Sequence, residues 1–192
     1  TESQRESLER IQRSQRMLLG LVNQVLNYAR VETGNVRYDI ADVPLDESLR
    51  AIEGLVAPQL RAKGLRYGYD GCDAALSVRA DGEKLQQIVL NLLTNAMKFT
   101  DRGGTITLTA EPLAELIRIR VSDSGIGIPE EKREVIFDPF VQVDANYTRT
   151  RDGVGLGLAI SRDLARGMGG NLVVESTDGE GSVFILTVPR AS

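Results

Sequence analysis

The chain has 192 residues, of which 42% are hydrophobic and 26% are charged, which is typical of a globular protein and excludes a disordered or fibrous one. Its formal net charge of -4 provides no electrostatic footprint for nucleic acid or an acidic membrane surface. The single cysteine, Cys72, excludes an internal disulfide, and there is no histidine at all. No apolar run approaches the roughly 20 residues that span a bilayer, so we expect a cytoplasmic module and leave membrane attachment of the full-length protein open.

Residues 7–32 are predicted to form one amphipathic helix. The apolar side chains on its main face are Leu8, Ile11, Leu18, Val22, Val25 and Ala29. They recur at steps of three, four and seven, the period of one helix face. Such a face needs a partner surface, which is either the domain that follows or other helices in the same chain or a second copy.

The rest of the chain alternates between strand and helix patterns. We expect a strand at 36–43, a helix from about 46 to 62, a hairpin of strands at 65–69 and 76–80, a helix at 81–99, a hairpin at 105–110 and 116–122, helices at 130–137 and 155–168, and final strands at 172–176 and 182–188. This order predicts an α+β fold, a two-layer α/β sandwich with a mixed sheet and helices on one face. The absence of a tandem βαβ rhythm argues against a Rossmann domain or a TIM barrel.

Three polar residues share one face of the predicted helix at 81–99. Asn91, Asn95 and Lys98 are spaced i, i+4 and i+7, so they project together. The carboxamides offer oxygen ligands for a hard cation such as Mg²⁺, and the ammonium offers a positive charge for phosphate. By itself the pattern also fits a merely solvated helix face.

A glycine-containing segment follows the strand at 116–122. In Asp123-Ser-Gly125-Ile-Gly127-Ile-Pro129, the glycines permit a sharp turn and close approach of a planar ligand to the backbone. The carboxylate of Asp123 is suited to accept a hydrogen bond from an exocyclic amine such as adenine N6. A simple turn is the alternative, whereas a calcium loop is disfavoured because too few oxygen ligands lie nearby.

A second glycine cluster, Gly153-Val-Gly155-Leu-Gly157, leads into the predicted helix at 155–168. Glycines before a helix N-terminus present backbone N–H groups to an anion, although a flexible hinge is the alternative. Residues 138–152 have no hydrophobic period. We expect them to include a lid, with a disordered loop as the alternative, and Arg149 or Arg151 could reach phosphate oxygens.

The order of these segments resembles that of the sensor histidine kinases. Residues 91–100 look like their N box, 123–127 like the first glycine box, 137–140 like the F box, 153–157 like the second glycine box, and 179–182 like a further small glycine box. The resemblance covers residues 36–192. It implies the Bergerat-type ATP-binding fold, which histidine kinases share with type II topoisomerases, MutL and heat-shock chaperone ATPases.

The resemblance also implies a site for Mg²⁺ and ATP. Asn91 and Asn95 would serve the metal and the phosphates, Lys98 would contact phosphate, and Asp123 would read the adenine amine. The nucleotide-binding residues implied in this way are Asn91, Asn95, Lys98, Phe99, Asp123, Gly125, Gly127, Ile128, Phe140, Arg149, Arg151, Gly153, Val154, Gly155, Leu156, Gly157, Leu158 and Ser182.

The residue type at position 91 distinguishes the branches of this superfamily. The hydrolytic relatives carry a Glu at the matching position, where it activates water, whereas an Asn cannot take a proton at neutral pH. We therefore expect catalysis by Asn91 and Lys98 of γ-phosphoryl transfer to an external histidine, with little hydrolysis.

Residues 1–34 look like the second helix of the family's dimerisation and phosphotransfer hairpin, and residues 35–192 like the catalytic domain. The acceptor histidine of the family lies on the first helix, so we expect the sequence to begin after it. The implied partners are ATP, that histidine-bearing helix, the receiver domain of a response regulator and a second copy in a homodimer. Two alternatives remain: a nucleotide-sensing interaction module that transfers no phosphate, and an ATPase of the topoisomerase or chaperone kind, which Asn91 disfavours.

Overall fold

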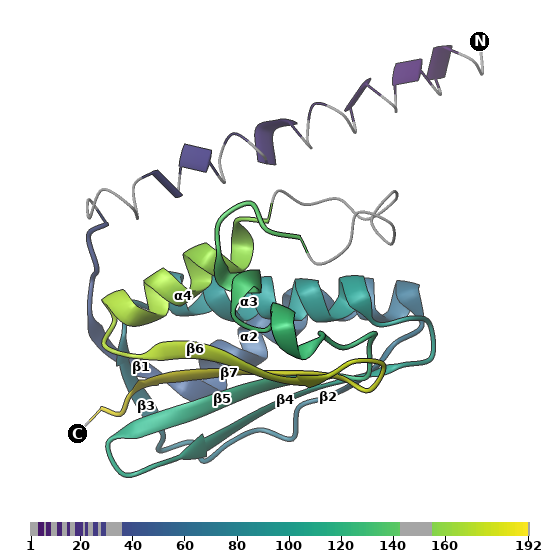
Figure 1. The fold of residues 1–192 in the computed structure, drawn as a ribbon. Coiled ribbons are helices and arrows are strands. Elements are labelled where there is room, and N and C mark those ends of the chain that lie inside the picture. Colours follow the sequence, from purple (N-terminus) through teal and green to yellow (C-terminus); the bar gives the residue numbers. More distant parts are fainter. Residues whose placement is uncertain are drawn as a thin grey trace.

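The computed structural model describes residues 36–142 and 155–191 continuously, together with part of the residues between 4 and 29. The described residues of the N-terminal part are helical, and in Figure 1 they project away from the rest of the chain. Large apolar side chains on this part are exposed, among them Leu8, Ile11, Leu18 and Leu19. The domain that follows therefore leaves these side chains uncovered.

A five-stranded mixed sheet forms one layer of the domain. Its strand order is β2-β4-β5-β7-β6, and only the β2–β4 pair is parallel. The strands are β2 (Arg66–Gly68), β4 (Thr105–Pro112), β5 (Leu116–Asp123), β6 (Asn171–Thr177) and β7 (Gly181–Pro189). A separate antiparallel pair joins β1 (Ala41–Pro44) to β3 (Ser77–Ala80).

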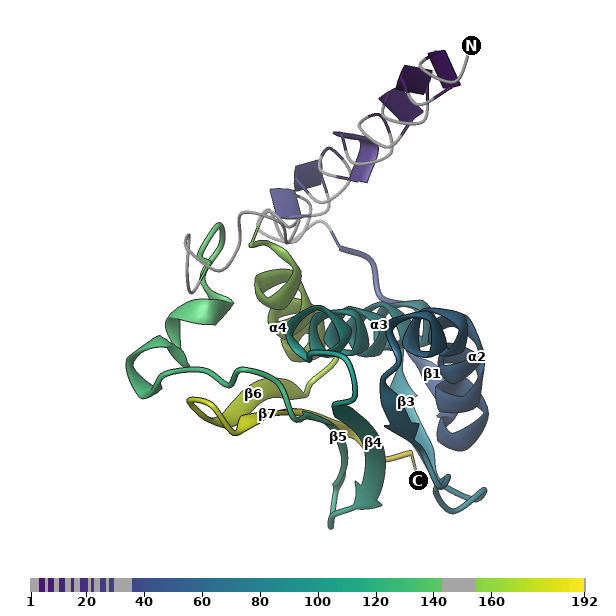
Figure 2. The ribbon, with the colours of Figure 1, turned by 90° about the vertical axis from the view of Figure 1, so that its right-hand side faces the viewer.

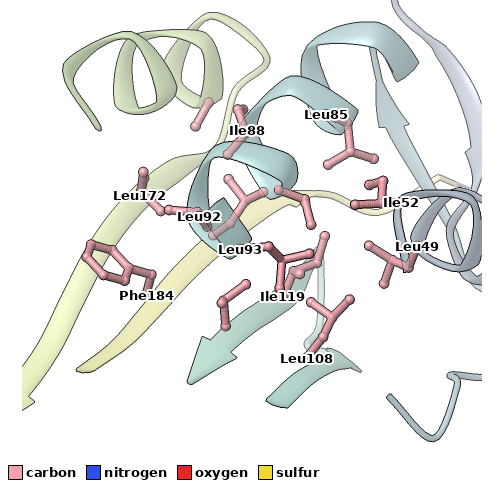
Figure 3. Packing of buried hydrophobic residues seen from close by; sticks show 14 of the residues in the cluster. Leu49, Ile52, Leu85, Ile88, Leu92, Leu93, Leu108, Ile119, Leu172 and Phe184 are labelled. Atoms are coloured by element: carbon pink, nitrogen blue, oxygen red, sulfur yellow. The ribbon is translucent and has the colours of Figure 1, made fainter. Parts of the chain in front are cut away.

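Three helices form the second layer on one face of the sheet: α2 (Leu45–Lys63), α3 (Gly82–Phe99) and α4 (Gly157–Gly167), as Figures 1 and 2 show. Inward side chains from both layers build one core, in which Leu49, Leu92, Ile119 and Phe184 are buried (Figure 3). The expected α+β sandwich with a mixed sheet and helices on one face is confirmed.

Local sequence signals set the ends of the helices that matter for the site. Asp81 caps α3, since its carboxylate accepts the backbone N–H of Lys84 at 3.1 Å. α2 ends at Gly64, whose left-handed φ of 68° is suited to glycine. α4 begins at Gly157 without a side-chain hydrogen bond at its N-cap residue, Leu156.

The predicted hairpin between 65–69 and 76–80 is wrong. β2 instead pairs in parallel with β4, and β3 pairs with β1. The connection between β2 and β3 is drawn toward α2, because the Asp46 carboxylate accepts hydrogen bonds from the Tyr69 hydroxyl at 2.8 Å and the Cys72 N–H at 3.1 Å. This attachment carries β3 away from β2.

Two further expectations need correction. Of the strand expected at 36–43, only residues 41–43 belong to a strand, β1, because residues 36–40 adopt no regular structure. The helix at 130–137 is replaced by two 3₁₀ turns, η1 (Glu130–Lys132) and η2 (Val135–Phe137). Its first four residues, Glu-Glu-Lys-Arg, carry no apolar side chain, and burial begins only with the adjacent Ile136 and Phe137, which do not form a helical face.

The segment before β1 is attached to the ends of two helices. The Asp39 N–H donates to Asp81 at 3.1 Å, at the start of α3. The Tyr38 ring lies against Gly167 at the end of α4, where an added Cβ would be 2.1 Å from the tyrosine hydroxyl oxygen. The absence of a side chain at Gly167 is therefore what makes room for Tyr38.

Candidate functional site

The polar face of α3 meets the start of α4. Asn91, Asn95 and Lys98 are all half-buried on α3. The Asn91 amide nitrogen donates to the hydroxyl of Ser161 on α4 at 3.0 Å. Its carboxamide also lies against Gly157, where an added Cβ would be 2.6 Å from the Asn91 oxygen. A glycine at the first position of α4 therefore allows the close approach of Asn91.

The C-terminal end of α3 meets the loop after β5. The Lys98 ammonium lies 5.0 Å from the centroid of the Phe99 ring. A Cβ added to Gly125 would be 2.6 Å from the Phe99 carbonyl oxygen and 2.7 Å from Asp123 Oδ1. Gly125 is thus the residue that lets the loop pass between α3 and the Asp123 carboxylate.

Asp123 lies at the end of β5, the central strand of the sheet. Its neighbours on the two sides are Ile106 of β4 and Ser182 of β7. Oδ1 accepts the N–H of Gly125 at 2.9 Å. Burial raises the pKa of the Asp123 carboxyl, while the backbone N–H groups of Gly125 and Ser182 act to lower it. A half-buried acceptor held in this way is suited to a ligand donor.

The turn between β6 and β7 supports the loop after Asp123. Gly127 has a φ of 72°, and an added Cβ there would be 1.9 Å from the Thr177 carbonyl oxygen. The Ile128 N–H donates to the Ser176 hydroxyl at 2.8 Å, which lies 2.9 Å from the hydroxyl of Ser182. Ser182 is buried, so the structure places it as a support for Ile128 and the loop.

The segments on either side of residues 143–154 are joined by a backbone hydrogen bond. The Phe140 N–H donates to the Gly155 carbonyl at 3.0 Å. Phe140 has a φ of 65°, uncommon for a residue with a side chain, and its ring is 58% exposed. Leu156 is fully buried and Leu158 packs on the core, so their contribution to a ligand would come from the backbone. The predicted residues Arg149, Arg151, Gly153 and Val154 lie outside the described residues.

Two polar residues of this region were not among the site residues predicted from the sequence. Ser161 is one turn after Gly157 on α4 and is buried against Asn91. Thr100 follows α3 and is fully buried, with a hydroxyl that has no hydrogen-bond partner among the described residues. The i+4 spacing from Gly157 to Ser161 is a signal that could have identified the serine.

The residues near Asn91 determine which metal chemistry fits. Within the described ranges, no group of three or more His, Cys, Asp or Glu side chains is placed to hold a metal ion. Neutral carboxamide oxygens from Asn91 and Asn95 suit a hard cation that takes most of its ligands from water and phosphate. This set fits Mg²⁺ bound together with a nucleotide and does not fit a self-contained metal centre.

Known proteins resemble this chain in sequence. Residues 80–192 match the family model described as histidine kinase-, DNA gyrase B- and HSP90-like ATPase. An uncharacterized sensor-like histidine kinase of Rhizobium meliloti is 37% identical over 186 residues, covering 97% of this chain and 35% of that protein. The chain therefore spans about a third of the length of this relative.

Solved structures agree with this match. Full-length ShkA in complex with AMPPNP has a TM-score of 0.88 and 34% identity, covering 100% of this chain and 40% of that one. The catalytic domain of the histidine kinase ThkA has a TM-score of 0.69 and 31% identity, covering 79% of this chain and 96% of that one. ThkA in complex with the response regulator TrrA has a TM-score of 0.72 and 29% identity, covering 94% and 49% respectively.

The chain belongs to the histidine kinase-, DNA gyrase B- and HSP90-like ATPases, and within them to the sensor histidine kinases. The expected Bergerat-type fold is confirmed with it. Among the described residues, no helix is long and apolar enough to cross a membrane.

Proposed function

We propose that this chain binds Mg²⁺ and ATP and transfers the γ-phosphoryl group to a histidine outside the chain. The observation that carries the proposal is the placement of a neutral Asn91 against the glycine-containing start of α4, where the N-cap residue Leu156 makes no side-chain hydrogen bond. A helix N-terminus without a side-chain cap offers its first N–H groups to phosphate, and the helix dipole favours the negative charge.

The two ends of the nucleotide would lie at the two clusters described above. Asp123 would accept a hydrogen bond from the adenine amine, with Gly125 and Gly127 keeping the backbone close to the base. Lys98 and the start of α4 would face the phosphates. Ile128, Phe99 and Ser182 would shape or support the purine side. The complex of ShkA with AMPPNP, an ATP analogue, supports nucleotide binding by this fold.

Asn91 and Asn95 are the residues that would hold Mg²⁺ through their amide oxygens. When bound, the ion would neutralise charge on the phosphates. Asn91 cannot remove a proton from water at neutral pH, which favours transfer over hydrolysis. The acceptor nitrogen would displace ADP from the γ-phosphorus and yield phosphohistidine, with positioning and charge stabilisation as the contribution of this chain.

The partners follow from the same proposal. The acceptor would be the histidine-bearing helix that pairs with residues 1–34 in a dimerisation hairpin, and the full-length protein would be a homodimer. The phosphoryl group would pass to the receiver domain of a response regulator. The complex of ThkA with its response regulator TrrA supports this last step.

The test supplies the acceptor separately. A polypeptide that carries both helices of the hairpin is mixed with this chain and γ-labelled ATP, and calorimetry measures ATP binding with and without Mg²⁺. We expect binding, transfer of label to the hairpin and slow hydrolysis. Binding without transfer would instead favour a nucleotide-sensing module, and rapid steady-state hydrolysis would favour an ATPase.

A further inference from the structure

Ser161 makes a contact that no function described above requires. Its side chain is 2% exposed and lies one turn into α4. The hydroxyl oxygen accepts the Asn91 amide N–H at 3.0 Å across the α3–α4 contact seen in Figure 2. A buried serine on an otherwise apolar helix face, bonded to a residue of the neighbouring helix, has a specific polar partner rather than a packing role.

The direction of this hydrogen bond matters for Asn91. The oxygen and the NH₂ group of a carboxamide have nearly the same shape, yet the oxygen is an acceptor and the NH₂ group is a donor. An amide that turned its nitrogen toward a cation would repel it. In the structure the Ser161 hydroxyl accepts from the amide nitrogen, which leaves the oxygen as the atom nearer to Gly157 at the start of α4.

Gly157 fixes the same carboxamide from a second side. An added Cβ at Gly157 would lie 2.6 Å from the Asn91 oxygen and 3.1 Å from its nitrogen. The edge of the amide that carries these two atoms therefore faces the start of α4, with Ser161 one turn further along. Rotation of the amide is restricted by the close approach of Gly157 to this edge and by the hydrogen bond at its nitrogen.

We propose that Ser161 is a positioning residue that acts through Asn91, holding the Asn91 amide oxygen in the orientation that binds Mg²⁺ in the Mg·ATP complex. This inference rests on the proposed function. Ser161 itself touches neither the metal nor the nucleotide. Its removal affects the metal-dependent part of binding and leaves the purine contacts of Asp123 intact.

The test is the Ser161→Ala variant, with the Mg²⁺ dependence of ATP binding measured by calorimetry. Without metal, we expect its ATP affinity to lie within about twofold of wild type. The increase in affinity that Mg²⁺ produces should fall by roughly three- to tenfold, the range expected for one neutral hydrogen bond. Ser161→Thr, which keeps a hydroxyl, should restore much of this increase.

Two measurements separate positioning from a structural effect. In an Asn91→Ala background, Ser161→Ala should change nothing further, because its effect passes through Asn91. The side-chain amide signals of Asn91 in the NMR spectrum, assigned by their loss in Asn91→Asp, should shift in Ser161→Ala. Gly157→Ala provides a second variant that disturbs the same amide from its other side and should also weaken the Mg²⁺ effect.

Three outcomes would overturn the inference. An unchanged Mg²⁺ effect in Ser161→Ala would show that Asn91 needs no such support. An equal loss of affinity with and without metal would show a structural role. Failure of the wild-type chain to bind ATP at all would remove the proposed function and this inference with it, whereas the first two outcomes leave the proposed function standing.

Discussion

Burial raises the pKa of the Asp123 carboxyl above its ordinary range, and the N–H groups of Gly125 and Ser182 only oppose that rise. A carboxyl whose pKa is higher in the folded chain holds its proton more tightly there than in the unfolded chain. Its contribution to stability is therefore greatest below the unfolded pKa of about 3.9 and is lost as the pH rises through the folded value. At neutral pH the ionised group is a cost to folding, which is consistent with a residue retained for binding.

Asp123→Asn should separate these two effects. The amide carries no charge to desolvate, so we expect a higher melting temperature than wild type at pH 7, and a difference that shrinks as the pH falls toward 3. ATP affinity should fall by roughly tenfold or more, as for loss of a charged hydrogen-bond acceptor. Thermal unfolding across the pH range and calorimetry check the two expectations. A lower melting temperature at pH 7 would contradict this account of Asp123.

The residues of the candidate site were predictable to different degrees. Asn91, Asn95 and Lys98 could be grouped because a helix period places them together, and Asp123 because it follows a strand and precedes glycines. For Ser161, the i+4 spacing from Gly157 indicates only that the two residues share a helix face, since its partner Asn91 is 70 positions away in sequence. Its role depends on how α3 and α4 pack, which no local pattern encodes.

At the scale of elements, Tyr38 and Asp39 in the segment before β1 connect the N-terminal part to both helices of the candidate site. Tyr38 occupies the space left by Gly167 on α4, and Asp39 donates to Asp81 at the cap of α3. Burial raises the pKa of the Tyr38 hydroxyl, and the charges of Asp163 and Asp81 raise it further, so it stays protonated in this contact. The attachment of Tyr38 to α4 depends on the absence of a side chain at Gly167.

Gly167→Ala should release this attachment. The added methyl group would displace the Tyr38 ring and loosen the backbone around Arg37, which is already exposed, so that trypsin can bind it. We expect cleavage at Arg37 to be several-fold faster than in wild type, with core stability changed by less than about 1 kcal/mol because alanine is itself favoured in helices.

Gly54→Ala on α2 is the matched control. Nothing lies within 4 Å of a Cβ added at this position. It should raise stability by about 0.5–1 kcal/mol and leave cleavage at Arg37 unchanged. Equal cleavage rates in Gly167→Ala and wild type would show that Tyr38 does not hold the segment.

The elements were predicted well where their signals are local. α3 was correct because its apolar period and the Asp81 cap agree, and the β4–β5 and β6–β7 hairpins were correct because short turns join their strands. β2 and β3 were paired wrongly because the partner of β2 is β4, across the whole of α3, and hydrogen bonds to Asp46 divert the connection. Such partners are set by tertiary contacts that compete with nearness in sequence.

At the scale of the whole molecule, the described N-terminal residues carry apolar side chains that the domain does not cover. Leu18 and Leu19 are each 62% exposed, and Leu26 is 52% exposed. Apolar side chains repeated along one helix favour association with a second apolar helix. This exposure agrees with the proposed homodimer.

We expect the chain to self-associate as its concentration rises, measured by sedimentation velocity. Leu19→Glu with Leu26→Glu should abolish the association, because burying two charges at a helix seam is costly. Leu55→Glu is the control, since Leu55 is 54% exposed on α2, outside that helix, and the change should leave association unaltered. A single monomeric species at every concentration tested would contradict the expectation.

The position of Asp123 on the central strand bears on how bound nucleotide departs. Its strand is hydrogen-bonded on both sides, so the amides around it should exchange with deuterium only when the whole domain unfolds. Gly155, just before α4, is by contrast held by a backbone hydrogen bond from Phe140 that lies outside the sheet and that local opening can break. On the proposed function, the purine end of the nucleotide would therefore be anchored to the longest-lived part of the fold and the phosphate end to a shorter-lived one. ADP release would then begin at the phosphates and end at the base.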